Sequence, residues 1–475
     1  MPAPPELVEL LARHGQEHLL QGWDSLNPGR RARLESDLRS IDLPLIDELV
    51  SALVRGQAEA DFDPARVGPV AVRRLPRTDG ERASRRLATE RGEAMLRDGE
   101  VGVILVAGGQ GTRLGFDAPK GTYPIGPVSA ASLFQIHAEK IVALGRRYGK
   151  AIPLYVMTSP ENHEATGRFF AEHGNFGLEH LRLFQQGTMP AVDRETGKIL
   201  LADADRVALS PDGHGGTLRA LAMPGPSGEP SCLEELRERG IRTLFYFQVD
   251  NPMVRIAEPT FLGFHHESDA EVSFKVDEKI EPEERVGVVV EVDGVPRVIE
   301  YSDLPPALAE LREPDGSLSL WAGSIAIHIF EREFIERAVT GGAHLPYHRA
   351  LKKVPFVGEG GKVVTPGEPN AVKFETFIFD TLPMARKFAI VETDRAIEFE
   401  PLKNATGPDS PATVRQRMSD LFGGWLEGAG VTVPRRSDGS IPFGLEISPL
   451  FALDAAELQA KLPPDLVVEE PLYLR

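Results

Sequence analysis

Hydrophobic residues in the first part of the chain recur at the spacing of an amphipathic helix. Leu34 and Leu38 are one helical turn apart, and leucines nearer the start follow the same pattern. Asn27 followed by Pro28 is typical of a helix N-cap with proline in the first turn. The pattern therefore predicts helices over residues 1–60.

From residue 101 the pattern changes to apolar runs that alternate with helical segments. The run "VGVILVA" (101–107) is continuously apolar, as expected of a strand buried on both faces of a largely parallel sheet. A helical pattern over 132–149 and a strand-like run over 153–159 follow. Later segments continue the alternation, with a helix over 161–173, a strand over 243–252 and further strand-like runs over 374–394. The order predicts an α/β core.

Three other stretches complete the outline. Alternation on both sides of Asp293-Gly294 predicts a β-hairpin over 286–304. The segment 62–80 is rich in proline and arginine and reads as an irregular connection to a helix over 81–97. After about residue 404 proline and glycine interrupt short helical and strand-like pieces, which predicts a small C-terminal domain.

Composition limits the possible environments and partners. The 475 residues are enough for two or three domains, and the net charge of −18 disfavours a nucleic-acid partner. The single cysteine, Cys232, favours a reducing, cytoplasmic setting. Neither a targeting segment nor a membrane span is expected, and no sustained heptad pattern indicates an oligomeric state.

The glycine-rich stretch "VILVAGGQGTRLGFDAPKG" (103–121) resembles several phosphate-binding loops. A P-loop needs lysine and a hydroxyl residue directly after its last glycine, but Thr112-Arg113 follows Gly111 here. The dinucleotide fingerprint needs its third glycine one position before Gly115 and a helix directly afterwards. Both alternatives are weak, as is the reading that this is a surface turn with solvated charges.

A nucleotidyltransferase loop explains the same residues. Gly108, Gly109 and Gly111 let the backbone approach a nucleotide closely. Arg113 offers a planar fork for phosphate oxygens, and Lys120 adds a point charge.

With this loop, the sequence resembles the UDP-sugar pyrophosphorylase family, and most closely the UDP-N-acetylhexosamine (UDP-N-acetylglucosamine) pyrophosphorylases. Blocks similar to those of the family occur in family order over nearly the whole chain. They include "GQEHLLQGW" (15–23), "FQQGTMPA" (184–191), "SPDGHGG" (210–216), "QVDNPMVRIAEP" (248–259), "VIEYSDL" (298–304), "FETFIFD" (374–380), "FEPLKNA" (399–405) and "EISPL" (446–450).

The resemblance implies a fold and a reaction. The fold is a nucleotidyltransferase α/β domain with a mixed, Rossmann-like sheet over about 100–403, preceded by a helical region (1–99) and followed by a small domain (404–475). The reaction joins UTP and a sugar-1-phosphate into a UDP-sugar and pyrophosphate, with N-acetylglucosamine-1-phosphate as the expected substrate. Both partners are already ionised near neutral pH, so no catalytic acid–base set is needed.

The resemblance also assigns the nucleoside contacts. Gly108 and Gly109 are expected to line the nucleoside, and Gly111 to keep the loop close to it. Gln186 and Gly215 are expected to contact the edge of the uracil.

The phosphate contacts follow from the same resemblance. Arg113 and Lys120 are expected to hold the phosphates of UTP, and Lys403 to contact the sugar phosphate and the charge that develops on the α-phosphate. Asp250 is the expected Mg²⁺ ligand, which accords with the one or two carboxylates that magnesium sites contain. Lys373 is a weaker candidate for the same phosphates.

The sugar site departs from the family pattern. Glu300 is expected to accept hydrogen bonds from sugar hydroxyls, with Gly287 leaving room for the ring. Ser324 and Ile327 replace asparagines of the N-acetylhexosamine enzymes, and His214 replaces a third. Serine is shorter than asparagine and offers one hydroxyl in place of an amide for hydrogen bonding. Glucose-1-phosphate or galactose-1-phosphate therefore remains an alternative substrate.

Two other classes stay open. A non-catalytic nucleotide-sugar binding protein would not need Arg113, Lys120 and Lys403, and a nicotinamide-dependent oxidoreductase would need the dinucleotide fingerprint. The histidines show no metal-ligand spacing with cysteine and are expected to be structural or exposed; they include His163, His214, His265 and His266.

Overall fold

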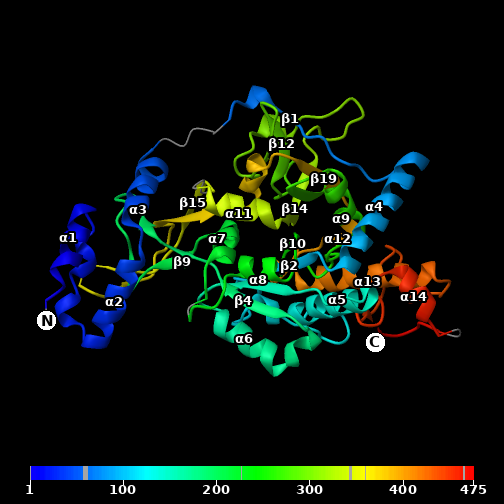
Figure 1. Ribbon diagram of the computed structural model, residues 1–475, viewed down its shortest axis with the longest axis horizontal. Helices are drawn as coiled ribbons and strands as arrows, with labels where there is room; N and C mark the ends of the chain where they lie inside the picture. The colour runs from blue at the N-terminus through cyan, green and yellow to red at the C-terminus, as the bar shows by residue number, and fades with distance from the viewer. Residues whose placement is uncertain (1, 57–61, 226, 342–344, 359, 464–465) are drawn as a thin grey trace. The chain divides into compact units, whose positions relative to one another are not determined.

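The computed structural model describes residues 2–56, 62–225, 227–341, 345–358, 360–463 and 466–475 (Figure 1). The chain divides into two compact units that combine distant parts of the sequence. The first contains residues 1–61, 186–217 and 344–380, and the second contains residues 62–185, 218–343 and 381–475. The predicted boundaries near 99 and 403 follow chain order only, and they stay a prediction.

The first unit packs helices against small antiparallel sheets. Asn27 caps its second helix as predicted, because the side-chain oxygen accepts from the Arg30 N–H at 3.0 Å, and Pro28 occupies the first turn. Leu34 and Leu38 are fully buried in a core that also contains Val192 of the small sheets. The elements are α1 (Pro5–Arg13), α2 (Pro28–Ser40), α3 (Leu43–Leu49), β5 (Thr188–Pro190), β6 (Val192–Asp193), β7 (Leu201–Asp203), β8 (Arg206–Val207), β9 (Leu209–Pro211), β15 (Tyr347–Lys352), β16 (Phe356–Val357), β17 (Val363–Val364) and β18 (Ala371–Thr376).

The second unit is built on a large mixed sheet. Its strands are β1 (Val67–Pro69), β2 (Val101–Val106), β3 (Leu154–Thr158), β4 (Leu181–Gln185), β10 (Thr243–Gln248), β11 (Val272–Glu278), β12 (Val288–Val292), β13 (Val295–Ile299), β14 (Ala322–Glu331) and β19 (Phe388–Glu392). The main order is β1-β12-β14-β10-β2-β3-β4, and β11 pairs with both β14 and β19. The predicted α/β class with a mixed sheet is confirmed.

Helices and a small sheet surround these strands. They are α4 (Asp79–Asp98), α5 (Leu133–Tyr148), α6 (His163–Glu172), α7 (Thr217–Ala222), α8 (Cys232–Glu238), α9 (Pro259–Glu267), α10 (Pro306–Ala309), α11 (Arg332–Thr340), α12 (Arg395–Glu398), α13 (Pro411–Gly428) and α14 (Ala455–Lys461), with β20 (Leu445–Ile447) and β21 (Leu472–Leu474). Several strands were not predicted, among them β4, β11 and β14. Strand β1 was missed because it is a three-residue edge strand inside the segment 62–80. Its register against β12, from Val67↔Val292, depends on a partner more than 200 positions away.

The parallel part of the sheet brings several loops to one edge. Strands β10, β2, β3 and β4 run parallel, and the hydrogen bonds continue past their ends. The Val249 N–H donates to the Val106 carbonyl at 3.0 Å, and the Ala107 N–H donates to the Met157 carbonyl at 2.8 Å. The glycine loop after β2 and the segment after β10 therefore leave the sheet together, at the edge where open α/β sheets bind ligands.

The predicted hairpin has a tight turn. Asp293 and Gly294 connect β12 to β13 with φ values of 53° and 79°. Two successive positive φ values are characteristic of a type I′ turn. The turn pairs Val288 with Ile299 and so fixes which residues face each other beyond the hairpin.

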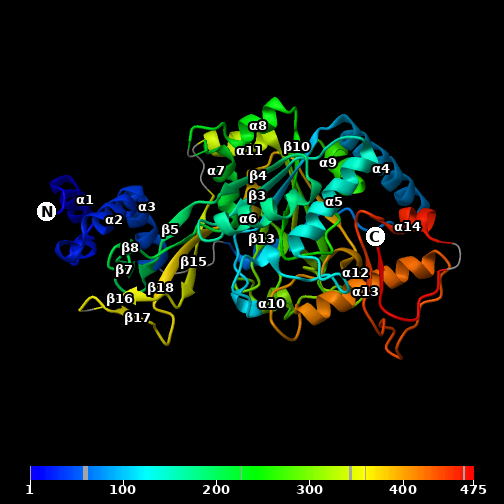
Figure 2. The ribbon, with the colours of Figure 1, turned by 90° about the horizontal axis from the view of Figure 1, so that it is seen from below.

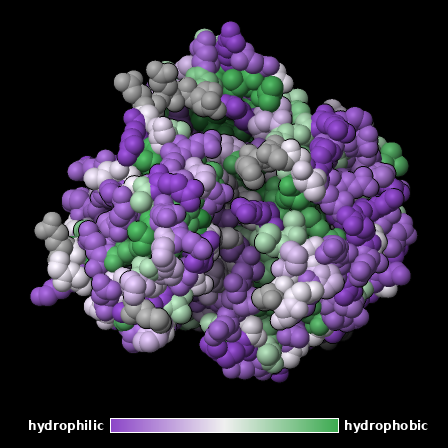
Figure 3. Space-filling model, turned by 60° about the vertical axis from the view of Figure 1, so that its left-hand side comes forward, coloured by the Kyte–Doolittle hydropathy of each residue, from purple (hydrophilic) through white to green (hydrophobic). Residues whose placement is uncertain are grey.

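The face of the molecule drawn in Figure 3 is largely polar. Hydrophilic residues cover most of the face drawn in Figure 3, and hydrophobic residues form small separate groups there. Within the described residues, no helix combines the length and apolar character that a membrane span requires.

Helices α4 and α9 run side by side (Figure 1, Figure 2). Two glycines make their close approach possible. A Cβ on Gly92 would lie 1.8 Å from the Pro259 carbonyl oxygen, and one on Gly263 would lie 1.7 Å from the Ala88 carbonyl oxygen. Because both obstacles are backbone atoms, neither helix can give way without moving as a whole.

We therefore expect Gly263→Ala to destabilise the protein by at least ~1–3 kcal/mol, the usual cost of overpacking. Gly424→Ala is the matched control, since Gly424 is an exposed helical residue of α13 whose Cβ would meet nothing within 4 Å. That control should be neutral or stabilising by up to about 1 kcal/mol. Urea unfolding measures both, and equal stability of the two variants would contradict the packing described.

Candidate active site

The glycine loop after β2 is folded back on itself. The Gly111 N–H donates to the Ala118 carbonyl at 2.9 Å, and the Lys120 N–H donates to the Gly109 carbonyl at 3.1 Å. These backbone bonds close the loop like a small hairpin. They return Lys120 to the neighbourhood of the strand end from which the loop departs.

A buried asparagine fastens this loop to the sheet. The Asn162 amide nitrogen donates to the Ala107 carbonyl at 2.9 Å and to the Gly109 carbonyl at 3.3 Å. Its side-chain oxygen accepts from the Ser159 N–H at 2.9 Å. Asn162 was not among the predicted site residues, because no local motif marks a residue that supports a loop more than 50 positions away.

The loop glycines have different reasons to be glycine. A Cβ on Gly109 would meet no atom within 4 Å, so this exposed position leaves open space for a ligand. A Cβ on Gly111 would lie 2.7 Å from the Phe116 carbonyl oxygen. Gly111 is thus required by the fold of the loop itself, and half-buried Gly108 lies where the strand ends. Their contacts with a nucleotide stay a prediction.

Lys120 and Asp250 form an ion pair at the edge of the sheet. The Lys120 Nζ lies 3.0 Å from Asp250 Oδ2, and the two side chains keep 17% and 14% of their surface exposed. Burial alone raises the pKa of Asp250, but the charges of Lys120 and Lys403 outweigh it and hold the pKa below its ordinary value. Asp250 is therefore an ionised carboxylate with two ammonium groups in its field.

Lys403 lies within the electrostatic influence of this carboxylate, on a separate segment of the chain. The Leu402 N–H donates to the Asp250 carbonyl at 2.8 Å, which ties the two segments together directly. The Lys403 N–H donates to the Asp409 carbonyl at 2.7 Å, and its Nζ lies 5.9 Å from the centre of the Phe399 ring. The structure thus brings together three of the charged residues predicted from the sequence.

Arg113 lies on the exposed rim of the loop. It belongs to the 3₁₀ turn Thr112–Leu114, which ends at Gly115 with a φ of 68°. Among the described residues, no hydrogen bond or ion pair engages its guanidinium group. Its five N–H donors are available to an anion.

The predicted sugar-site residues lie together beyond the hairpin. The Ser324 N–H donates to the Gly287 carbonyl at 2.8 Å. A Cβ on Gly287 would lie 3.0 Å from Glu300 Oε1, which places these two residues opposite each other past the register of β12 and β13. Ser324 and Glu300 are both half-buried, so each retains some access to solvent.

Ile327 does not belong to this group. Its side chain is 1% exposed and lies in the main hydrophobic core. A bulge in β14 lies between Ser324 and Ile327, where Ala326 has a φ of 56°. Ile327 therefore contributes to packing, and of the two positions in β14 where an asparagine is replaced only Ser324 lies at the surface near Glu300.

The expected uracil contacts belong to the first unit. Gln186 is buried just before β5, and Gly215 follows β9, the strand that pairs with β5. A Cβ on Gly215 would lie 2.7 Å from the Thr376 carbonyl carbon, so the turn can approach β18 only with glycine here. Lys373 is a half-buried residue of β18.

The histidines occupy structural or exposed positions. His163 Nδ1 lies 2.7 Å from the Thr158 hydroxyl, His265 Nδ1 lies 2.7 Å from the Ser273 hydroxyl, and His266 is exposed. His214 Nδ1 accepts from the Ile378 N–H at 3.1 Å, and burial lowers the pKa of this imidazole to about 4. Among the described residues, no cluster of three or more His, Cys, Asp or Glu side chains could hold a metal ion by itself.

Two residues of α5, the buried His137 and the half-buried Lys140, support the segment that carries Asp250. His137 Nε2 lies 3.0 Å from the Val249 carbonyl oxygen, and the Lys140 Nζ donates to the Pro252 carbonyl at 2.6 Å and the Val254 carbonyl at 2.8 Å. Burial lowers the pKa of His137 to about 3 and that of Lys140 to about 7. The helix α5 was predicted correctly from the sequence, but no role was predicted for these two side chains.

Comparison with known proteins decides the family. The sequence profile of UTP–glucose-1-phosphate uridylyltransferase matches residues 65–412. The chain belongs to this family. It is 40% identical to human UDP-N-acetylhexosamine pyrophosphorylase-like protein 1, over 95% of this chain and 93% of that protein. It is 37% identical to the UDP-N-acetylglucosamine pyrophosphorylase of Saccharomyces cerevisiae, over 90% of this chain and 91% of that protein.

A solved structure of the family agrees. The chain matches the UDP-N-acetylglucosamine pyrophosphorylase of Trypanosoma brucei with a TM-score of 0.82 and 27% identity, covering 98% of this chain and 97% of that one. The resemblance to UDP-sugar pyrophosphorylases seen in the sequence motifs is thus confirmed, and with it the nucleotidyltransferase class and fold.

We expect His137 to make stability depend on pH. Its pKa falls from 6.5 to about 3 on folding, so below pH 6.5 the unfolded chain gains a proton here that the folded protein does not. Stability should therefore fall with decreasing pH by up to ~1.4 kcal/mol per unit from this residue alone. His137→Gln keeps an N–H donor for the Val249 carbonyl but cannot titrate.

Urea unfolding of both proteins between pH 7.5 and 5.0 measures this contribution. The wild-type stability minus the variant stability should decrease as the pH falls below about 6.5. A difference that does not change with pH would show that His137 is already charged in the folded protein or exposed there.

Proposed function

We propose that the protein transfers the uridylyl group of UTP to a sugar-1-phosphate, releasing pyrophosphate, and that N-acetylglucosamine-1-phosphate is the preferred acceptor. The observation that carries the proposal is the Asp250 carboxylate beside Lys120 and Lys403, at the edge of the sheet where the glycine loop ends. Relatives named as UDP-N-acetylglucosamine pyrophosphorylases, similar over nine-tenths of the chain, support it.

The chemistry requires positioning and charge neutralisation. A phosphate oxygen of the sugar-1-phosphate attacks the α-phosphorus of UTP, and the bond from that phosphorus to the oxygen bridging to pyrophosphate breaks. No proton needs to be removed from the attacking oxygen near neutral pH. Arg113 and Lys120 hold the phosphates of UTP, and Lys403 neutralises the charge that grows between the acceptor and the α-phosphate.

The residues present suit a magnesium ion as well. Asp250 is an ionised carboxylate with part of its surface accessible, and magnesium sites for nucleotides use one or two carboxylates together with phosphate oxygens and water. Asp250 is the proposed protein ligand, and Mg²⁺ bound there would supply further charge neutralisation to the phosphates. The Lys403 ammonium group would neutralise charge on the phosphates in addition to Mg²⁺.

The sugar preference rests on fewer residues. Glu300 accepts hydrogen bonds from ring hydroxyls. Gly287 lets this carboxylate pack closely, because a Cβ there would lie 3.0 Å from Glu300 Oε1. Ser324 offers a hydroxyl at the surface near them, which can donate one hydrogen bond to the sugar. Because an N-acetyl group gains less from a hydroxyl than from an amide, turnover of glucose-1-phosphate is the specific alternative.

The direct test incubates the purified protein with UTP, Mg²⁺ and one of four sugar-1-phosphates while pyrophosphate release is followed. The four are N-acetylglucosamine-, N-acetylgalactosamine-, glucose- and galactose-1-phosphate. We expect the highest kcat/KM with N-acetylglucosamine-1-phosphate, and release that depends on Mg²⁺.

Two results would contradict the proposal in different ways. Release with glucose-1-phosphate but not with N-acetylglucosamine-1-phosphate would reassign the sugar and leave the uridylyltransferase reaction intact. Absence of release with every acceptor, in protein that still binds UTP, would support a non-catalytic nucleotide-binding role.

A further inference from the structure

Asn251 links the two segments that carry the charged site residues. It follows Asp250 directly, and its side chain is 5% exposed. The amide nitrogen donates to the Glu398 carbonyl at 2.8 Å. The amide oxygen accepts from the Met253 N–H at 3.2 Å and from the Glu400 N–H at 3.3 Å. One side chain therefore bonds both to its own segment and to the chain that leads to Lys403.

Only a carboxamide satisfies all three of these backbone groups. Two of them are N–H donors that need an oxygen, and the third is a carbonyl that needs a donor. An aspartate in the same shape keeps the oxygen but cannot donate to the Glu398 carbonyl. An apolar residue of similar size would leave all three backbone groups without this hydrogen-bond partner. Unsatisfied buried polar groups destabilise a protein strongly.

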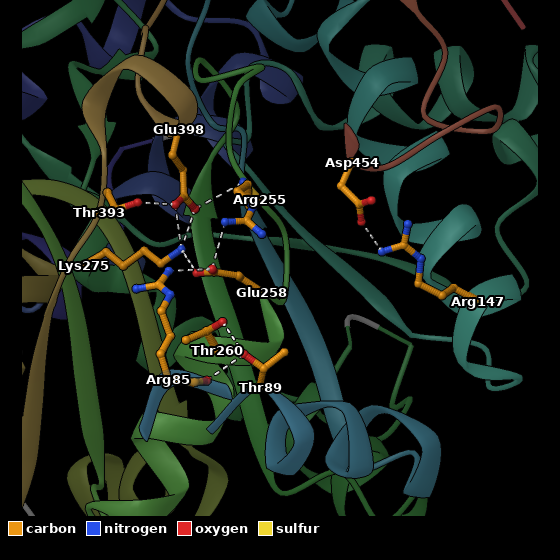
Figure 4. Close-up of polar contacts among 10 residues, drawn as sticks. All are labelled: Arg85, Thr89, Arg147, Arg255, Glu258, Thr260, Lys275, Thr393, Glu398 and Asp454. Atoms are coloured by element: carbon orange, nitrogen blue, oxygen red, sulfur yellow. Dashed lines mark hydrogen bonds and ion pairs between the residues drawn. The ribbon is translucent and has the colours of Figure 1, made fainter. Parts of the chain in front are cut away.

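A buried ion cluster holds the Glu398 side chain, at the start of the segment that leads to Lys403 (Figure 4). The Lys275 Nζ lies 2.6 Å from a carboxylate oxygen of Glu398 and 2.6 Å from one of Glu258. The Arg255 N–H donates to Glu398 Oε1 at 3.2 Å, and its guanidinium pairs with Glu258 at 2.9 Å. Lys275 is 1% exposed and both carboxylates are buried, so these charges depend on one another.

The cluster therefore holds the side chain of Glu398, while Asn251 bonds to its backbone carbonyl. Burial alone raises the pKa of Glu258, but Lys275, Arg255 and Arg85 outweigh it and lower that pKa, so the carboxylate is ionised. The Leu402 N–H adds the direct bond to the Asp250 carbonyl. Peptide groups at 398, 400 and 402 are thus fixed just before the chain reaches Lys403.

We propose that Asn251 is a positioning residue, which sets Lys403 against Asp250 through the backbone of residues 398–402. The inference rests on the catalytic role proposed above for Lys403. Asn251 is buried, and its amide is engaged by three backbone groups. Its effect is geometric, because a reaction that depends on placed charges loses much of its rate when a group moves by about 1 Å.

The test combines Asn251→Asp and Asn251→Ala with Lys403→Ala, singly and together, in the uridylyltransferase assay. We expect Asn251→Asp to lower kcat about 10- to 100-fold while the Kd for UTP changes less than about threefold. In the Lys403→Ala background the same change should cost less than about threefold, because the residue through which it acts is already gone.

Asn404→Ala is the matched control for Asn251→Ala. Asn404 is an exposed asparagine next to Lys403, and its amide donates to the Pro408 carbonyl at 2.9 Å without crossing to the Asp250 segment. It should change kcat less than about threefold. Circular dichroism and the fraction of protein able to bind UTP show whether each variant is folded. If Asn251→Ala does not fold, Asn251→Asp alone completes the cycle.

The outcomes separate the two proposals. If the fold losses in kcat of the single variants multiply in the double variant, Asn251 does not act through Lys403. The positioning role is then overturned, as it is if both Asn251 variants keep the wild-type kcat, and in either case the proposed role of Lys403 is unaffected. Wild-type kcat in Lys403→Ala would overturn the role of Lys403 and the inference with it. A parallel loss of kcat and UTP affinity in Asn251→Asp would assign Asn251 to general folding.

Discussion

The ion pair between Lys120 and Asp250 is the contact on which the rest of the site depends. It joins the glycine loop to the segment after β10, and it exists because β2 and β10 run parallel with matched ends. A carboxylate this buried would be expensive to ionise alone, since burial opposes its charge. The charges of Lys120 and Lys403 offset that cost and keep the Asp250 carboxylate ionised.

Much of the surrounding structure serves to hold these charges in place. Asn162 fastens the loop, while His137 and Lys140 hold the carbonyls on both sides of Asp250. Asn251 then connects this segment to the one that carries Lys403. A reaction without an acid–base set gains its rate from such preorganised charge, because polar groups fixed in advance need not reorganise as the reaction proceeds.

Local features of the fold could be predicted from the sequence, and long-range features could not. The Asn27 cap and the Asp293-Gly294 turn depend on neighbouring residues, and both are as expected. Strand β1 and the grouping of residues 186–217 and 344–380 with the N-terminal helices depend on contacts between distant segments. For the site, motifs identified the charged residues, but the supporting roles of Asn162 and Asn251 depend on bonds to backbone groups of distant segments, which the sequence does not show.

We infer that Lys120, Asp250 and Lys403 form the phosphate-binding centre. A crystal structure of the protein with UDP-N-acetylglucosamine and Mg²⁺ tests it most directly. We expect both lysine Nζ atoms within hydrogen-bond distance of the diphosphate oxygens, and an Asp250 oxygen at about 2.0–2.1 Å from the metal. A diphosphate bound away from these three side chains would contradict it.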